Sequence, residues 1–277
     1  MSKRVDEIYE ELDGLFTFRI FLGVPMVYDP DKKRYIHLTE TLTQRYAQKY
    51  STIKPRPKAS ESKEVFGLIQ SLSETLDAHK HLILFGDDYK TQKVWNMTTV
   101  EWEPVPKDIS HIVWRSSTPP AKEGSRGVEA ARQFLMDVAK GNERHMADIL
   151  QACAPLFTTT KPLGVIWFSG AGRNGKSGVV KLLHHLLGDY LTKITLHQIQ
   201  DGKITPALNG HLGNILEESS EGYIDDSEKY KIIGEHGTFI VRKYHSQDTI
   251  TVDTSMMHTI FNCLLYTSDA ADDLLCV

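Results

Sequence analysis

The chain has 277 residues, of which 40% are hydrophobic and 25% are charged, and its formal net charge is −4. This composition is that of an ordinary globular protein, long enough for one large or two modest domains. The net charge argues against a protein that coats nucleic acid with its whole surface, but it is compatible with a local basic strip.

Neither a membrane span nor an export signal is visible in the sequence. No apolar run reaches the roughly 18 residues that a span needs, and the N-terminus leads into acidic, helical sequence. The cysteines Cys153, Cys263 and Cys276 lack metal-ligand spacing and make no disulfide framework. We therefore expect a reducing, cytoplasmic setting.

The N-terminal third mixes helical and β-rich patterns. Residues 4–14 predict a short acidic helix, and the runs 16–22 and 34–38 flank a turn-forming cluster at 29–33, which predicts a β-hairpin. The Lys- and Pro-rich stretch 54–63 predicts a mobile loop or linker, and helical spacing follows over 65–72. A second β-rich patch covers 81–85 and 93–97, with Asp87-Asp88 as its turn.

The middle of the chain predicts a connecting region. The stretch 119–125 has the composition of a linker, and apolar residues then recur at helical spacing over 127–157. Residues 158–162 break that pattern.

A short apolar strand, Val165–Phe168, precedes a glycine-rich loop and a helix closed by Gly188. This order is the setting of a phosphate-binding loop, whose backbone turns several N–H groups onto phosphate oxygens. In that interpretation Lys176 neutralises the β- and γ-phosphates, Ser177 is a Mg²⁺ ligand, and the positive end of the helix faces the same anion. The expected ATP-binding residues are Gly170, Ala171, Gly172, Arg173, Asn174, Gly175, Lys176, Ser177 and Gly178.

Hydrolysis also needs carboxylates beside the phosphates. Glu217 and Glu218 end the apolar run at Ile215-Leu216, and we expect Glu217 on the metal and Glu218 as the base that polarises water. Successive strand residues face opposite ways, so the two roles should differ. The alternative is that these acids open a solvated helix.

Two further segments have the chemistry of nucleic-acid or phosphate contacts. Arg242 and Lys243, beside Tyr244, end a β-rich run and suit a hairpin that touches a phosphate backbone and stacks a base, although a solvated hairpin fits as well. Asn262 ends the last apolar strand, where an amide can bond both the attacking water and the γ-phosphate; such an Asn is also a common turn residue.

Together, these ordered segments resemble a superfamily 3 helicase of the phage and plasmid primase–helicase group, which includes the poxvirus-type primase-helicases. The resemblance rests on four segments. The first two are Asn174 before Gly175-Lys176-Ser177 and residues 208–218, which resemble the family's second acidic motif. The other two are residues 231–244, which resemble its DNA-contacting hairpin, and Asn262, at the place of its sensor asparagine. The resemblance implies an α/β P-loop NTPase of the AAA+ type, with a mostly parallel sheet flanked by helices and a smaller α+β domain before it. It also implies a hexameric ATPase that binds single-stranded or forked DNA and unwinds DNA at a replication origin or fork, together with other replication proteins.

The resemblance gives the expected domains: an accessory region over 1–118, a helical linker or collar over 119–160, and an incomplete ATPase core over 161–263. The family needs an arginine finger and further sequence after its sensor motif, and residues 264–277 have no family counterpart. They resemble translated sequencing-adapter sequence, so we expect a non-native tail on a C-terminally truncated chain with impaired hydrolysis; an ordinary short helix is the alternative. No primase chemistry is evident.

Two other functions stay open from the sequence. The first is a phosphate-loop kinase, which would need an arginine-rich lid that the sequence does not show. The second is a DNA-binding or assembly module that holds ATP as a structural ligand without hydrolysing it.

Overall fold

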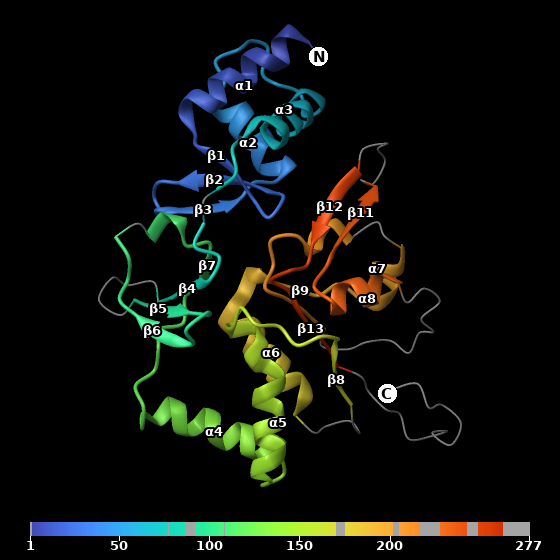
Figure 1. The fold of residues 1–277 in the computed structure, drawn as a ribbon. Coiled ribbons are helices and arrows are strands. Elements are labelled where there is room, and N and C mark those ends of the chain that lie inside the picture. Colours follow the sequence, from blue (N-terminus) through green and yellow to red (C-terminus); the bar gives the residue numbers. More distant parts are fainter. Residues whose placement is uncertain are drawn as a thin grey trace. The chain divides into compact units, whose positions relative to one another are not determined.

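The computed structural model describes residues 2–76, 78–86, 92–107, 109–169, 175–201, 205–216, 228–242 and 249–262. The fold is mixed α/β, with helices and several small sheets, one of which is parallel throughout (Figure 1). Packing divides the chain into two compact units, Met1–Lys80 with Pro106–Val113, and His81–Val105 with Trp114–Val277. The domain boundaries expected after residues 118, 160 and 263 stay predictions.

The first unit joins three helices to a three-stranded antiparallel sheet of order β1-β2-β3. Its elements are α1 (Lys3–Leu15), β1 (Phe18–Phe21), β2 (Val24–Asp29), β3 (Arg34–His37), α2 (Glu40–Tyr50), α3 (Ala59–Leu72) and the 3₁₀ turn η1 (Ile109–His111). The hairpin expected between 16–22 and 34–38 is therefore wrong in its pairing. An unpredicted strand, β2, lies between them and pairs with both, since the chain already turns at Leu22 and Gly23, which have positive φ angles.

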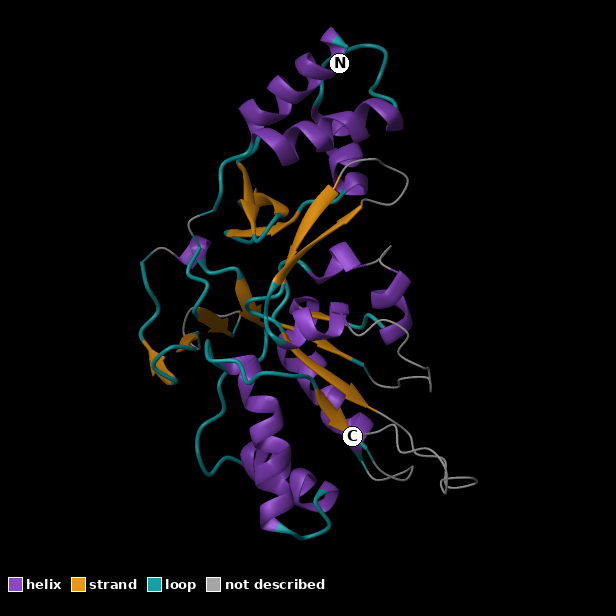
Figure 2. Cartoon of the chain, turned by 45° about the vertical axis from the view of Figure 1, so that its right-hand side comes forward, coloured by secondary structure: helices purple, strands orange, loops and turns teal. Residues whose placement is uncertain are grey.

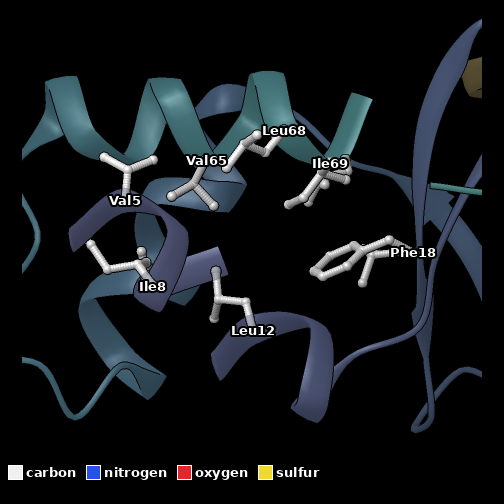
Figure 3. Close-up of a cluster of buried hydrophobic side chains, with 10 residues drawn as sticks. Val5, Ile8, Leu12, Phe18, Val65, Leu68 and Ile69 are labelled. Atoms are coloured by element: carbon white, nitrogen blue, oxygen red, sulfur yellow. The ribbon is translucent and has the colours of Figure 1, made fainter. Parts of the chain in front are cut away.

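The core of this unit is made by the apolar faces of α1 and α3. Helical spacing places Val5, Ile8 and Leu12 on one side of α1, and all three are almost fully buried. They meet Val65, Leu68 and Ile69 of α3, and Phe18 of β1 closes the cluster (Figure 3).

The segment between α2 and α3 is held in place. The Arg4 guanidinium donates hydrogen bonds to the carbonyl oxygens of Lys54 and Pro55 and pairs with Glu61 at 2.7 Å. The mobile loop expected over 54–63 is thus wrong for its second half, because α3 begins at Ala59, and its first half is tied to α1.

The second unit contains a small mixed sheet of order β6-β5-β4-β7. Its strands are β4 (Leu82–Phe85), β5 (Lys93–Asn96), β6 (Glu101–Glu103) and β7 (Trp114–Ser116), so the predicted β-rich patch is confirmed, while its turn at Asp87-Asp88 lies outside the described residues. The Trp95 indole N–H donates to the Phe157 carbonyl at 2.7 Å, and the Trp114 ring meets Tyr190 edge-on at 5.5 Å. These contacts tie the mixed sheet to the rest of the unit.

The helical stretch expected over 127–157 is divided in two. It forms α4 (Arg126–Val138), α5 (Glu143–Cys153) and the 3₁₀ turn η2 (Ala154–Phe157). Lys140 and Gly141 have positive φ angles, which end the first helix, and the Asn142 side chain accepts hydrogen bonds from the first N–H groups of the second.

Four parallel strands form the central sheet of the second unit, in the order β8-β13-β10-β9. The strands are β8 (Ile166–Phe168), β9 (Leu191–Thr192), β10 (Gly213–Ile215) and β13 (His258–Asn262). The connecting elements are α6 (Lys176–Leu187), the 3₁₀ turns η3 (Gly188–Tyr190) and η4 (Thr205–Leu208), α7 (Leu196–Asp201), α8 (Glu228–Gly234), and the antiparallel strands β11 (Thr238–Arg242) and β12 (Thr249–Asp253).

One face of this sheet builds an apolar core with the elements that follow it. Phe261 of β13 and Leu216, just after β10, are buried with Ile233 of α8, Val241 of β11 and Val252 of β12. Within the described ranges, no helix combines the length and the apolar character needed to cross a bilayer.

A buried asparagine fixes the sheet at its β9–β10 side. The Asn214 side chain accepts from the Thr192 hydroxyl and the Ile194 N–H, both at 2.8 Å, and donates to the Ile194 carbonyl at 2.9 Å. Asn214 and Ile194 are 1% and 5% exposed, so these groups have no ready access to water.

We predict that Asn214→Leu destabilises the protein by about 2–4 kcal/mol, because it leaves the buried N–H and carbonyl of Ile194 unpaired. Urea unfolding of the variant measures the loss. Thr192→Val is the matched control, since it removes one of the three hydrogen bonds and leaves Ile194 paired. Equal stability of the Asn214 variant and the wild type would contradict the assigned role.

Candidate nucleotide site at the carboxyl edge of the parallel sheet

Three strands of the parallel sheet end at the same edge. Phe168 of β8 pairs with Asn262 of β13, and Ile260 pairs on its other side with Ile215 of β10. The ladder continues past β10, because the Leu216 N–H donates to the Ile260 carbonyl at 3.1 Å. Ligands of open parallel sheets bind outside the carboxyl ends of the strands, so a ligand-binding site is expected at this edge.

The predicted site residues follow these three strand ends. Gly170 comes two residues after β8, Glu217 comes two residues after β10, and Asn262 is the last residue of β13. Five loop residues (Gly170, Ala171, Gly172, Arg173 and Asn174) and the acidic pair (Glu217 and Glu218) lie outside the described residues, and of Asn262 only the backbone is described. Their site roles stay predictions.

The chain re-enters the described structure at the start of α6. Gly175 has a φ of 84°, the left-handed region that favours glycine, and its carbonyl accepts from the Gly178 and Val179 N–H groups. The buried positions of α6 (Val179, Val180, Leu183 and Leu187) recur at helical spacing, and the helix ends at Gly188 as the sequence predicts.

Lys176 is the first residue of α6, and it is only 9% exposed. Lysine is almost never that buried without a charged or polar group to receive it. Lys176 thus places a largely buried cation at the start of α6, at this edge of the sheet. Ser177 and Gly178 follow it in the first turn, where a helix presents N–H groups and the positive end of its dipole to an anion.

Helix α4 packs directly against this first turn, and the sequence alone did not indicate the contact. A Cβ placed on Gly175 would lie 2.6 Å from Val138 Cγ2, and one placed on Gly178 would lie 2.8 Å from Phe134 Cζ. Phe134 and Val138 are four residues apart on one face of α4. Their apolar spacing was visible in the sequence, but their partner was not.

A second unpredicted contact joins α6 to β10. The His184 imidazole Nε2 lies 3.0 Å from the Ile215 carbonyl, two residues before Glu217. The helix that follows the glycine loop is thus connected to the strand that leads into the acidic pair.

The described residues fit a bound triphosphate. A left-handed glycine opens the helix, a buried ammonium group stands at its first position, and α4 leaves no room for a side chain at Gly175 or Gly178. Lys176, Ser177 and the backbone of the first turn would hold the phosphates and Mg²⁺.

The segment expected to contact DNA is a two-stranded hairpin. Strands β11 and β12 pair from Thr238 with Asp253 to Arg242 with Thr249 (Figure 2). Arg242 is the last residue of β11; its side chain, and Lys243 and Tyr244 after it, lie outside what is described. The hairpin stands against the apolar core through Val241 and Val252, and Ile240 on its other face is 70% exposed.

At the opposite end of the strands, His258 is buried, and the partly buried Lys161 and His236 lie close enough to affect its charge. The His258 Nε2 lies 2.9 Å from the Ala152 carbonyl and must carry the donated proton, and Nδ1 has no hydrogen-bond partner among the described residues. Burial, with smaller effects of Lys161 and His236, lowers the pKa of His258 to about 4, against the hydrogen bond to Ala152, which raises it. Burial also lowers the pKa of Lys161 to about 8.

No family model and no curated protein matches this chain. Solved structures of similar fold exist, among them two apo structures of the NrS-1 C-terminal region. The "A form" is 14% identical with a TM-score of 0.52, over 93% of this chain and 56% of that one. The second is 16% identical with a TM-score of 0.52, over 97% of this chain and 61% of that one.

At this identity the similarity shows a shared fold. The present chain spans about three-fifths of the length of these solved chains or slightly less.

We predict that Gly178→Ala destabilises the protein, although alanine inside a helix normally adds about 0.5–1 kcal/mol over glycine. The new methyl group would meet the Phe134 ring. Thermal unfolding should show a loss for Gly178→Ala and a smaller loss, or none, when Phe134→Ala already removes the ring.

The matched control is Gly67→Ala, also inside a helix, where a Cβ meets nothing within 4 Å and the usual gain is expected. If Gly178→Ala raised the unfolding temperature as much as Gly67→Ala, the packing of α4 on α6 would be refuted.

We predict that His258 makes stability fall in mild acid. The pKa of His258 in the folded protein, about 4, lies below the ordinary histidine pKa of 6.5, so the unfolded chain binds more protons between these values. Its contribution to stability is complete above pH 6.5 and is lost as pH falls toward 4, at a rate of at most about 1.4 kcal/mol per pH unit.

His258→Gln removes this titration, so the difference in unfolding free energy between wild type and variant should change with pH across that window. A constant difference would contradict the prediction.

Proposed function

We propose that this chain is the ATPase region of a DNA-unwinding replication motor of a phage or mobile element, of the superfamily 3 helicase type. The observation that carries the proposal is the strand order. Because β13 lies between β8 and β10, the segments that contain the phosphate loop, Asn262 and the Glu217-Glu218 pair leave the sheet side by side.

In this proposal the residues divide the work of phosphate-bond cleavage. The bond that is broken joins the β- and γ-phosphates of Mg·ATP. Lys176 neutralises charge on the β- and γ-phosphates, Ser177 and Glu217 hold the metal, and Glu218 accepts the proton of the attacking water. Asn262 orients that water against the γ-phosphate, since an amide both donates and accepts.

DNA is the proposed macromolecular partner. Strand β11 ends at Arg242, and Lys243 and Tyr244 follow it in the sequence, which gives two cations and an aromatic residue in succession. Cations at a hairpin tip can follow a phosphate backbone, and the ring can stack a base. A ring of copies would bring several such tips to one strand, as expected of a homohexamer.

The comparisons support this proposal at the level of fold. The shared fold with the NrS-1 C-terminal region extends over nearly the whole of this chain. We propose that the activity of the whole protein, its loading partners and its arginine finger depend on parts beyond this region or on neighbouring subunits.

ATP turnover of a longer chain that includes the parts beyond this region, with and without single-stranded DNA, tests the proposal. We expect turnover that rises severalfold with DNA in the wild type. Lys176→Ala should lower it on the order of a hundredfold or more, because the phosphate charge is left uncompensated. Glu218→Gln should retain ATP binding and lose hydrolysis.

Lys181→Ala is the matched control, since Lys181 is an exposed lysine on the same helix and should be neutral. Turnover that ignores DNA but needs a small acceptor would point instead to a kinase. Tight ATP binding without turnover in a longer chain would point to ATP as a structural ligand.

A further inference from the structure

The first unit has a charge distribution that the motor does not explain. Residues 41–60 contain five cations and no carboxylate, although the whole chain has a net charge of −4. All five are exposed: Arg45, Lys49, Lys54, Arg56 and Lys58. We name this set the α2–α3 basic surface.

We propose that the α2–α3 basic surface is a second nucleic-acid contact, which holds the phosphate backbone of single-stranded nucleic acid. It goes beyond the proposed motor, because it needs neither ATP nor the β11–β12 hairpin and lies in the other unit of the chain.

The cations of the α2–α3 basic surface are not neutralised by salt bridges within the first unit. Among the residues that the structure describes, none of the five belongs to a salt bridge. Two acids that contact this segment have other partners: Glu61 pairs with Arg4, and Glu11 accepts from the Ser51 hydroxyl at 2.6 Å and the Thr52 N–H at 3.1 Å. Lys58 is close enough to Glu61 to help lower the pKa of that acid, so its own charge is partly offset.

The backbone beneath the surface is fixed in advance. Arg4 binds the carbonyls of Lys54 and Pro55, Glu11 holds Ser51 and Thr52, and two prolines restrict the segment. The segment is anchored through its backbone while its cationic side chains are exposed. A surface that is already ordered loses less entropy when it binds, which favours a specific contact over a loose solvated loop.

An aromatic side chain lies within the basic surface. Tyr50 is 38% exposed, and the Lys49 ammonium stands 4.8 Å from its ring centre. Phe16 and Tyr46 meet the Tyr50 ring edge-on at 5.1 and 5.9 Å, and they stack on each other at 4.6 Å. Cations beside a supported, partly exposed ring are what single-strand binding surfaces use to hold phosphate and stack bases. This combination favours nucleic acid over an acidic protein or a lipid headgroup.

The test is binding of labelled oligodeoxythymidine to the full chain by fluorescence anisotropy, without nucleotide, across a salt series. The triple variant Arg45→Gln, Lys49→Gln, Arg56→Gln should weaken binding at least about tenfold. It should also reduce the slope of log affinity against log salt by about 2, since each phosphate contact on a single strand contributes about 0.7. Tyr50→Ala should weaken binding severalfold with little change in the slope.

The matched control carries the same change in charge elsewhere: Lys3→Gln, Lys122→Gln, Lys181→Gln, all at exposed positions. It should bind within about twofold of the wild type. An equal loss in both triple variants, or no loss in the first, would overturn the proposal. Binding to anionic phospholipid vesicles that the first triple abolishes, with oligonucleotide binding intact, would overturn the assignment of the partner.

The result of this oligonucleotide-binding test does not depend on the result of the ATP-turnover test of the proposed motor. Arg242→Ala with Lys243→Ala, in the same assay, tests the hairpin independently of the basic surface. Loss of ATP turnover would leave the basic-surface result standing, and failure of the basic surface would leave the motor untouched.

Discussion

The pairing of β13 with β8 on one side and β10 on the other is the constraint on which the second unit depends. Three chain segments that are far apart in sequence, around 168, 215 and 262, are brought to one sheet edge by hydrogen bonds between strands of three to five residues. A shift of one residue in either ladder would turn the side chains of that strand to the other face of the sheet. The apolar core with Phe261 and Leu216 on one face opposes such a shift.

Around this edge, packing restricts what the start of α6 can do. Val138 and Phe134 press against the two glycines, the Ile215 carbonyl meets His184, and the helix is buried along one side. A loop that binds phosphates in a fixed geometry benefits from such support, because freedom at the first turn would have to be lost on binding.

Much of the sheet and its helices could be predicted from local pattern. The apolar runs of β8, β10 and β13, the helix after the glycine loop, and its end at Gly188 follow from periodicity and turn chemistry. Strand β2 was missed because Pro25 and a two-residue turn disguise it, and the helical run 127–157 concealed a break at Lys140 and Gly141. The strand order, the contacts of Phe134 and Val138, and the bonds of Asn214 join residues distant in sequence, which periodicity does not contain.

The central claim is that Lys176 and the first turn of α6 receive a triphosphate at this edge. Calorimetric titration of the purified chain with Mg·ATP tests it most directly. If Lys176 and the first turn of α6 bind the nucleotide, we expect a saturable heat of binding that excess ADP competes away. A titration without heat, and without competition between the two nucleotides in a displacement assay, would contradict it.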